Sequence, residues 1–115
     1  MLRNDVLRKQ ADFDALYKKG KSVGDRFVVV IYYKNGLDHN RIGFLASKKV
    51  GNSVMRNRAR RLMKESFRMI TDELSQGYDI VIIARNTITG RSFSEVDKSL
   101  RNALKRTGLL SGDKI

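Results

Sequence analysis

The sequence predicts an α/β two-layer sandwich in which helices pack on a mixed sheet. Two observations carry this prediction. Segments with strand-like and helix-like apolar spacing follow one another in the order α, β, β, (β), α, β, α. A strand, a basic helix and a buried strand are consecutive over residues 41–84, which implies two parallel strands joined by a crossover helix. The 115 residues suit one domain, 1–115, with a modest core.

The first predicted element is a helix at residues 10–19. Phe13, Leu16 and Tyr17 recur at i, i+3 and i+4, and Gly20 follows the last turn. Phe13 and Tyr17 have two interpretations: core beneath the helix, or the lining of an exposed groove that stacks unpaired bases. The cations that flank this aromatic pair are Arg8, Lys9, Lys18 and Lys19.

Three strands are predicted from composition. Residues 27–33 are β-branched and aromatic, and a turn separates them from a second strand at residues 41–46. Residues 78–84 form an almost continuous apolar run and predict a buried strand. An additional short strand is expected near residues 21–24 or 47–49.

Two further helices complete the fold. The basic helix begins at Asn52 or Ser53, either of which can act as its N-cap, and is expected to run to about residue 74. The last helix begins with a capping box at residues 92–95, and Gly108 ends it.

Alternation and helical spacing predict which side chains form the core. In the strand at 41–46, the core face carries Ile42, Phe44 and Ala46. The other face, expected to be wetter, carries Arg41, Gly43 and Leu45. The apolar side of the basic helix carries Met55, Ala59, Leu62, Met69 and Ile70. The apolar stripe of the last helix carries Phe93, Val96, Leu100, Ala103 and Leu104.

The basic helix has its cations on one side. Between Asp38 and Glu65 the chain carries eight Lys or Arg residues and no carboxylate. One row of the helix consists of Arg56, Arg60, Lys64 and Arg68. Like charges at this spacing repel by a few tenths of a kcal/mol per pair, so an isolated helix gains nothing from them. Phosphates lying on the row would release condensed counterions, which favours binding to nucleic acid.

The overall charge indicates the same class of partner. Twenty-four Lys and Arg against twelve Asp and Glu leave a net charge of +12, which repels itself strongly without a polyanion. A solubilising surface or an anionic membrane is the alternative, but the cations are clustered rather than interspersed. The chain has no cysteine and no signal-peptide run at its N-terminus, and its longest apolar run, residues 27–33, is too short for a membrane span. We expect a cytoplasmic protein.

No residue pattern indicates that this chain performs catalysis alone. His39 lies in a polar turn, and the adjacent Asp72 and Glu73 are expected to solvate a helix end. Glu65 is expected to pair with Arg61 or Arg68. There is no phosphate-binding loop of known spacing and no set of metal ligands. We therefore expect a binding subunit with no catalytic residue and no cofactor or metal of its own.

A family resemblance sharpens this prediction. Residues 56–64 read Arg-Asn-Arg-Ala-Arg-Arg-Leu-Met-Lys, and with residues 47–52 before them they resemble the signature of the bacterial ribonuclease P protein component. Residues 11–20 resemble the first helix of that family. Residues 41–44 and 79–85 resemble its two parallel strands. Two positions depart from the family pattern, Ser53 and Ala59, and Ala59 falls on the apolar side of the helix, so only local packing is affected.

The resemblance implies both fold and function. It implies a left-handed crossover around the basic helix, a rare exception among such connections. It implies a subunit of the ribonucleoprotein that removes 5′ leaders from precursor tRNA, in which the RNA subunit holds Mg²⁺ and performs the hydrolysis. Contacts to that catalytic RNA are expected from Lys48, Lys49, Arg56, Asn57, Arg58, Arg60, Arg61 and Lys64, and from Arg68 in the same row. Phe13 and Tyr17 would line a cleft for the single-stranded leader.

Other functions compete with this interpretation. A ribosomal or other structural RNA-binding protein would share the charge and the α/β pattern, and only the ordered set of motifs separates the two. A self-sufficient nuclease would need catalytic residues that the sequence lacks. A helix-turn-helix DNA-binding protein is disfavoured, because strands rather than a second short helix flank the basic helix.

Overall fold

The computed structural model describes residues 6–7 and 9–110, so the cation predicted at Arg8 lies outside the described residues. The elements are α1 (Gln10–Lys19), β1 (Lys21–Gly24), β2 (Val28–Lys34), β3 (Arg41–Leu45), α2 (Ser53–Ile70), η2 (Thr71–Glu73), β4 (Tyr78–Ala84), η3 (Asn86–Ile88) and α3 (Phe93–Thr107). The predicted order of helices and strands is confirmed. The additional short strand is β1, whereas residues 48–50 form a turn.

One mixed sheet organises the fold. Its strand order is β1-β2-β4-β3, so β3 is an edge strand. β2 runs antiparallel to both β1 and β4, and β3 runs parallel to β4. α2 therefore is the crossover between parallel neighbours that the sequence predicts. The left-handed sense of that crossover stays a prediction.

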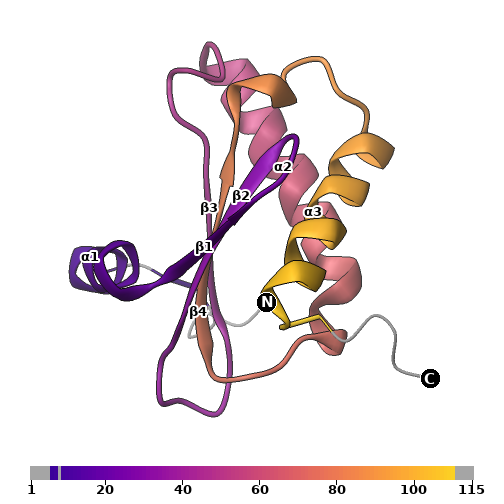
Figure 1. Cartoon of the computed structure of the whole chain (residues 1–115). Helices are drawn as coiled ribbons and strands as arrows, with labels where there is room; N and C mark the ends of the chain where they lie inside the picture. The colour runs from indigo at the N-terminus through magenta and orange to yellow at the C-terminus, as the bar shows by residue number, and fades with distance from the viewer. Residues whose placement is uncertain (1–5, 8, 111–115) are drawn as a thin grey trace.

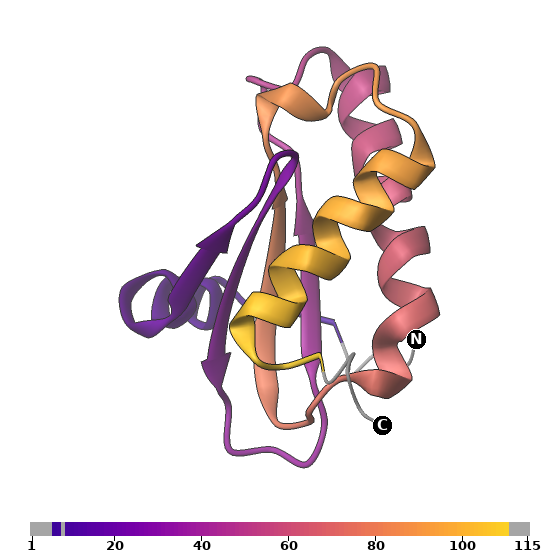
Figure 2. The ribbon, with the colours of Figure 1, turned by 45° about the vertical axis from the view of Figure 1, so that its right-hand side comes forward.

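The helices cover both faces of the sheet. Figures 1 and 2 show α2 and α3 side by side on one face and α1 on the other. The larger core lies between the sheet and the α2–α3 pair and includes Phe67, Ile82 and Leu100, all buried. A smaller core beneath α1 is built on Leu7, Leu16 and Val81. The predicted α/β fold with helices packed on a mixed sheet is confirmed, but α1 on the opposite face adds a third layer to the two that the sequence predicted. Among the described helices, none is long and apolar enough to cross a membrane.

The buried side of α2 differs from the prediction. Ala59 and Ile70 are buried as expected, but Met55 is 43% exposed and Met69 is 59% exposed. Met63 and Phe67, which the prediction omitted, are fully buried instead. Met69 follows Met63 by six residues, which places it about 120° around the helix from the core-facing row. The prediction was therefore wrong for both exposed methionines.

The face of β3 expected to be wetter is in fact covered by α1. Gly43 is buried, and a Cβ added to it would lie 3.3 Å from Cε1 of Phe13. Leu45 is half-buried beside the smaller core. Because glycine has no side chain, the ring of Phe13 can lie directly on the strand. The strand prediction holds, and the correction concerns only what covers this face.

The helix ends follow their capping residues. Asn52 is the N-cap of α2, with the backbone N–H of Met55 donating to its Oδ1 at 3.0 Å. The capping box of α3 is present: the N–H of Glu95 donates to Ser92 Oγ at 3.2 Å, and the N–H of Ser92 donates to Glu95 Oε1 at 3.0 Å. Gly108 ends α3 in the left-handed conformation at φ 84°.

Candidate nucleic-acid interface

α2 presents its polar side to solvent. Asn57, Arg61 and Lys64 are exposed, and Arg60 is partly exposed. The opposite side of the helix packs on the core through Met63 and its neighbours. The amphipathic helix is thus oriented as the charge pattern predicts, with its cations available to a partner.

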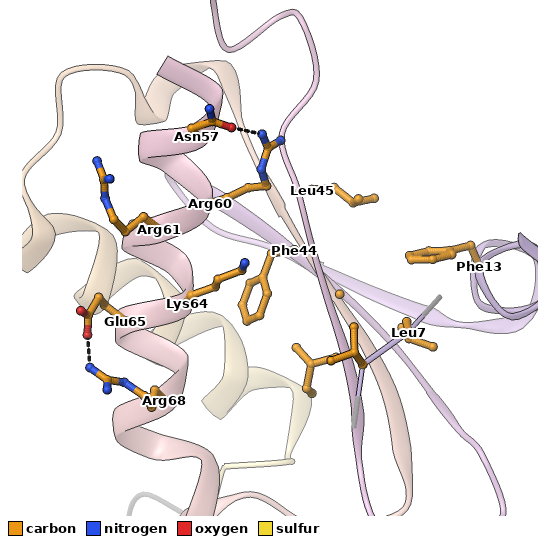
Figure 3. A pocket seen from close by; sticks show the side chains of 13 residues that line it. Leu7, Phe13, Phe44, Leu45, Asn57, Arg60, Arg61, Lys64, Glu65 and Arg68 are labelled. Atoms are coloured by element: carbon orange, nitrogen blue, oxygen red, sulfur yellow. Dashed lines mark hydrogen bonds and ion pairs between the residues drawn. The ribbon is translucent and has the colours of Figure 1, made fainter. Parts of the chain in front are cut away.

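A groove of about 830 Å³ lies between this side of α2, the edge strand β3 and α1. Of the residues predicted from sequence, it is lined by Phe13, Asn57, Arg60, Arg61, Lys64 and Arg68. The lining residues that sequence reasoning did not assign to a site are Val6, Leu7, Ile42, Gly43, Phe44, Leu45 and Glu65. Figure 3 shows that the groove extends around β3, with Phe44 and Lys64 on one side of the strand and Phe13 on the other.

The groove combines an apolar floor with a cationic wall. Phe13, Phe44 and Leu45 supply apolar surface, while α2 supplies four cations. Glu65, the one carboxylate among the described residues of the lining, pairs with Arg68, one of the two partners predicted for it. A nucleotide offers the matching chemistry, because its base is a flat apolar surface and its phosphate is an anion.

The remaining cations have different environments. Arg60 donates to Oδ1 of Asn57. Among the described residues, Arg61 and Lys64 have no ion-pair partner, so no ion pair in this part of the chain compensates their charges. Uncompensated cations beside an apolar surface attract phosphate.

Several predicted RNA-binding residues lie outside the groove. Arg56 Nη1 donates to the carbonyl of Gly51 at 2.9 Å, and Arg58 Nη1 donates to the carbonyl of Arg91 at 3.2 Å. Both arginines therefore also fix the loops next to α2. Lys48 and Lys49 are exposed in the turn before α2 and extend the basic surface beyond the groove.

Phe13 and Tyr17, the aromatic pair of α1, agree in part with each of the two interpretations, core beneath the helix and lining of an exposed groove. The ring centroids of Phe13 and Tyr17 are 6.4 Å apart. Phe13 is half-buried, packs against the smaller core and lines the groove. Tyr17 is 47% exposed and does not line it. Partial burial, assisted by the negative charge of Asp14, raises the pKa of the Tyr17 phenol, which therefore stays neutral.

An ion-pair network anchors α1 to the sheet beside the groove. Arg41 Nε donates to Oδ1 of Asp79 at 2.8 Å, and its Nη2 donates to Oδ2 at 2.7 Å. Its Nη1 reaches Asp12 of α1 at 3.3 Å. Asn35 also donates to Oδ1 of Asp79 at 3.0 Å. The hydrogen bonds to Asp79 raise the pKa of Arg41. The sequence signal for this network was Asp79 itself, a carboxylate in an otherwise apolar strand.

Among the residues that the structure describes, the histidine and the acidic side chains form no metal site. His39 Nδ1 lies 2.9 Å from Oδ1 of Asp38, its neighbour in the polar turn. Asp72 and Glu73 are exposed at the end of α2, where the sequence places them. Across residues 6–7 and 9–110, no three His, Cys, Asp or Glu side chains gather as metal ligands would.

A cationic helix row beside an apolar groove, both held on an α/β scaffold, defines a small basic protein that binds nucleic acid. Comparison with known proteins narrows this class. The sequence model of the Ribonuclease P family matches residues 1–108, and the chain belongs to this family. It is a protein component of ribonuclease P, the tRNA-processing endoribonuclease, and its partner is the RNA subunit of that enzyme.

The relatives are similar along nearly their whole length. The ribonuclease P protein component of Caldanaerobacter subterraneus is 46% identical over 103 residues, which cover 90% of this chain and 89% of the relative. That of Alkaliphilus oremlandii is 42% identical over 105 residues, covering 91% and 92%. None of these similarities supports the alternative of a ribosomal or other structural RNA-binding protein.

Solved structures share the fold. The RNase P protein of Staphylococcus aureus superposes with a TM-score of 0.85 at 35% identity, covering 93% of this chain and 98% of that one. The protein of Thermotoga maritima superposes with a TM-score of 0.80 at 35% identity, covering 88% and 96%. The mixed sheet with three helices is therefore the fold of the family.

Proposed function

We propose that, within ribonuclease P, this chain binds the catalytic RNA through α2 and holds the single-stranded 5′ leader of precursor tRNA at the groove. One observation carries this proposal. Phe13 on α1 and the cations of α2 line the same groove around β3, although about 50 residues separate them in the sequence. An apolar ring and a row of cations are thus presented together to one ligand.

The outer side of α2 and the floor of the groove have separate roles. The outer side of α2 supplies exposed Arg58 and Arg61 to phosphates of the RNA subunit, with Lys48 and Lys49 extending the contact. At the floor, Phe13 offers a face on which an unpaired base stacks, an interaction worth about 1–3 kcal/mol per base. Tyr17, one turn further along α1, extends this aromatic surface.

The protein contributes binding rather than bond breaking. Hydrolysis of a phosphodiester is promoted by metal ions that polarise its oxygens, and in this proposal phosphates of the RNA subunit hold the Mg²⁺. The cations of α2 reduce the repulsion between the two RNA chains and so stabilise the complex of enzyme and substrate. We place this activity in the bacterial cytoplasm; a chain without cysteine suits that reducing compartment.

A reconstitution experiment tests the proposal. The RNA subunit is assayed for precursor cleavage over a series of Mg²⁺ concentrations, with and without the protein. We expect the protein to shift cleavage to lower Mg²⁺, and we expect no cleavage by the protein alone. Cleavage by the isolated protein, or an unchanged Mg²⁺ dependence when it is added, would overturn the proposal.

A further inference from the structure

We propose that a second pocket, on the β1–β2 side of the sheet and away from β3, binds an unpaired nucleotide of RNA. This tyrosine–lysine pocket has a volume of about 410 Å³. Its chemistry comes from Lys19, Lys21, Lys34, Tyr32, Tyr33 and Tyr78. Small-molecule pockets in proteins span about 300–1,000 Å³, so the space suits one nucleotide rather than a duplex.

Strand pairing brings these side chains together. Lys21 of β1 is directly opposite Tyr32 of β2, and Lys34 of β2 is directly opposite Tyr78 of β4. Because Tyr32 and Lys34 are two residues apart on one strand, all four residues share one face of the sheet. The end of α3, with Thr107 and the residues after it, forms the adjoining wall. The arrangement is thus fixed by the register of the sheet.

The aromatic side chains form a partly open surface. The ring centroids of Tyr32 and Tyr78 are 6.3 Å apart and their planes are tilted by 55°. Both rings are half-buried against the larger core, whereas Tyr33 is 38% exposed. Rings that are fixed on one side and open on the other are suited to stacking with a base.

The charges indicate an anionic ligand. The three lysines are exposed, and none of the described residues that line the pocket carries a carboxylate. Within the described part of the chain, none of the three has an ion-pair partner. A purely structural role explains the packed Tyr32–Tyr78 pair but leaves three neighbouring like charges, which destabilise the fold when nothing neutralises them. A phosphate group neutralises them, and a base occupies the aromatic surface.

Because the partner of this chain is an RNA, we infer that the nucleotide in the pocket belongs to RNA. Two RNA sources offer the same chemistry: the leader of the precursor, and an unpaired segment of the RNA subunit. Phe13 in the groove and Lys19 in the pocket are six residues apart on α1, a rise of about 9 Å. A strand that leaves the groove along α1 therefore reaches the pocket within a few nucleotides. The inference does not depend on this path, because the RNA subunit can supply the nucleotide as well.

Paired lysine variants test the proposal in the reconstituted holoenzyme. Lys21→Gln with Lys34→Gln removes two charges from the pocket without touching its packed rings. Lys98→Gln with Lys105→Gln is the matched control, because both lysines are exposed on α3 and the change in net charge is the same. We expect the pocket variant to bind RNA about tenfold more weakly than the control variant does. The slope of log affinity against log salt concentration should also be smaller in magnitude by about 1.4. Each of the two lost phosphate contacts contributes about 0.7 to this slope on a single strand.

The source of the nucleotide follows from which ligand is affected. A loss seen with the RNA subunit alone assigns the pocket to that subunit, whereas a loss seen only with long-leader precursor assigns it to the leader. A photoreactive phenylalanine at position 33 gives a second measurement, since it should cross-link to an unpaired nucleotide of the same RNA. The proposal is overturned if the pocket and control variants bind all RNAs alike, or if position 33 cross-links only to base-paired RNA or to protein.

Discussion

Arg41 and Asp79 are directly opposite each other in the parallel β3–β4 pair, and the guanidinium contacts the carboxylate with two of its nitrogens, at 2.8 and 2.7 Å. The third nitrogen of Arg41 reaches Asp12, the residue before Phe13. One side chain therefore ties α1 to the sheet at the margin of the groove. The position of Phe13 over β3 depends on this contact as well as on the apolar packing beneath α1.

Replacing Arg41 should destabilise the fold. In Arg41→Met the buried Asp79 loses its charged partner, and removing one member of a buried pair costs about 3–5 kcal/mol. We expect about 3 kcal/mol, because a quarter of the Arg41 side chain remains exposed. Urea unfolding measures the loss. The control is Arg68→Met, which breaks an exposed pair and should cost less than about 1 kcal/mol. Equal losses in the two variants would contradict the role assigned to Arg41.

Arg60→Ala should weaken binding of the RNA subunit and lower its salt dependence. The arginine lines the groove on the exposed side of α2, and the loss of one phosphate contact should lower the salt slope by roughly one phosphate's worth. Filter binding over a salt series measures both effects. Lys98→Ala, which removes one charge from α3, should leave the slope closer to that of the wild type. A slope unchanged in Arg60→Ala would remove this residue from the interface.

Phe13→Ala should reduce affinity for precursor tRNA while leaving affinity for mature tRNA unaffected. The ring faces the groove, and losing one stacked base costs about 1–3 kcal/mol, or roughly 5- to 150-fold in affinity. Equilibrium binding of the holoenzyme to both ligands measures the difference. Phe93→Ala, which truncates a half-buried ring on α3, is the control for general loss of packing. Equal losses for the two ligands would argue against a leader site at Phe13.

Gly43→Val should disturb the same site from beneath. Even a Cβ at this position would lie 3.3 Å from the Phe13 ring, and the two further methyl groups of valine would displace it. Overpacking of this kind costs about 1–3 kcal/mol. We expect lower thermal stability together with weaker precursor binding. Normal precursor binding by the folded variant would show that the ring position is unimportant.

Asp25 should make stability sensitive to acid. Burial alone would raise its pKa, but hydrogen bonds from the Arg26 N–H, the Ser99 hydroxyl and Arg106, at 2.7, 3.0 and 2.7 Å, lower the pKa overall. A carboxylate with a lowered folded-state pKa stabilises the protein above its unfolded-state pKa, about pH 4, and this contribution is lost as pH falls through the folded-state value.

Asp25→Asn should therefore destabilise the protein by about 1–3 kcal/mol at neutral pH and flatten the pH dependence of unfolding below about pH 4. Urea unfolding from about pH 2 to about pH 7 measures the effect, because this range covers both the protonated and the ionised carboxyl. Asp72→Asn changes an exposed carboxylate and should have little effect at neutral pH. An unchanged acid transition in Asp25→Asn would show that other groups control it.

Sequence periodicity predicted the cationic, solvent-facing side of α2 better than its apolar, core-facing side. The cations at every fourth residue could be read directly, because a charged row has few alternative interpretations. The methionines could not be assigned in the same way: Met55, Met63 and Met69 are alike in composition, and only the packing of α3 and the sheet decides that Met63 is buried. Spacing identifies an amphipathic helix more reliably than it fixes the direction of its apolar side.

The groove itself could not be predicted from local sequence. It exists because β3 is the edge strand, and strand order depends on pairing between residues far apart in the chain. The anchor at Arg41 has the same origin, since its partners Asp12 and Asp79 are 29 and 38 residues away. Phe13 and Tyr17 were singled out as a pair, and their ring centroids are 6.4 Å apart, but only the fold shows that Phe13 lines the groove whereas Tyr17 does not.

The residues just before α1 cover part of the edge of β3, which affects aggregation between copies of this protein. Val6 forms a parallel bridge with Ile42, and the N–H of Leu7 donates to the carbonyl of Ile42 at 3.0 Å. At the other margin of the sheet, β1 is only four residues long and begins with Lys21. Exposed strand edges are where separate chains add to one another and aggregate, and short, charged or covered edges oppose this. Both margins of the sheet therefore oppose edge-to-edge pairing between separate copies of this protein.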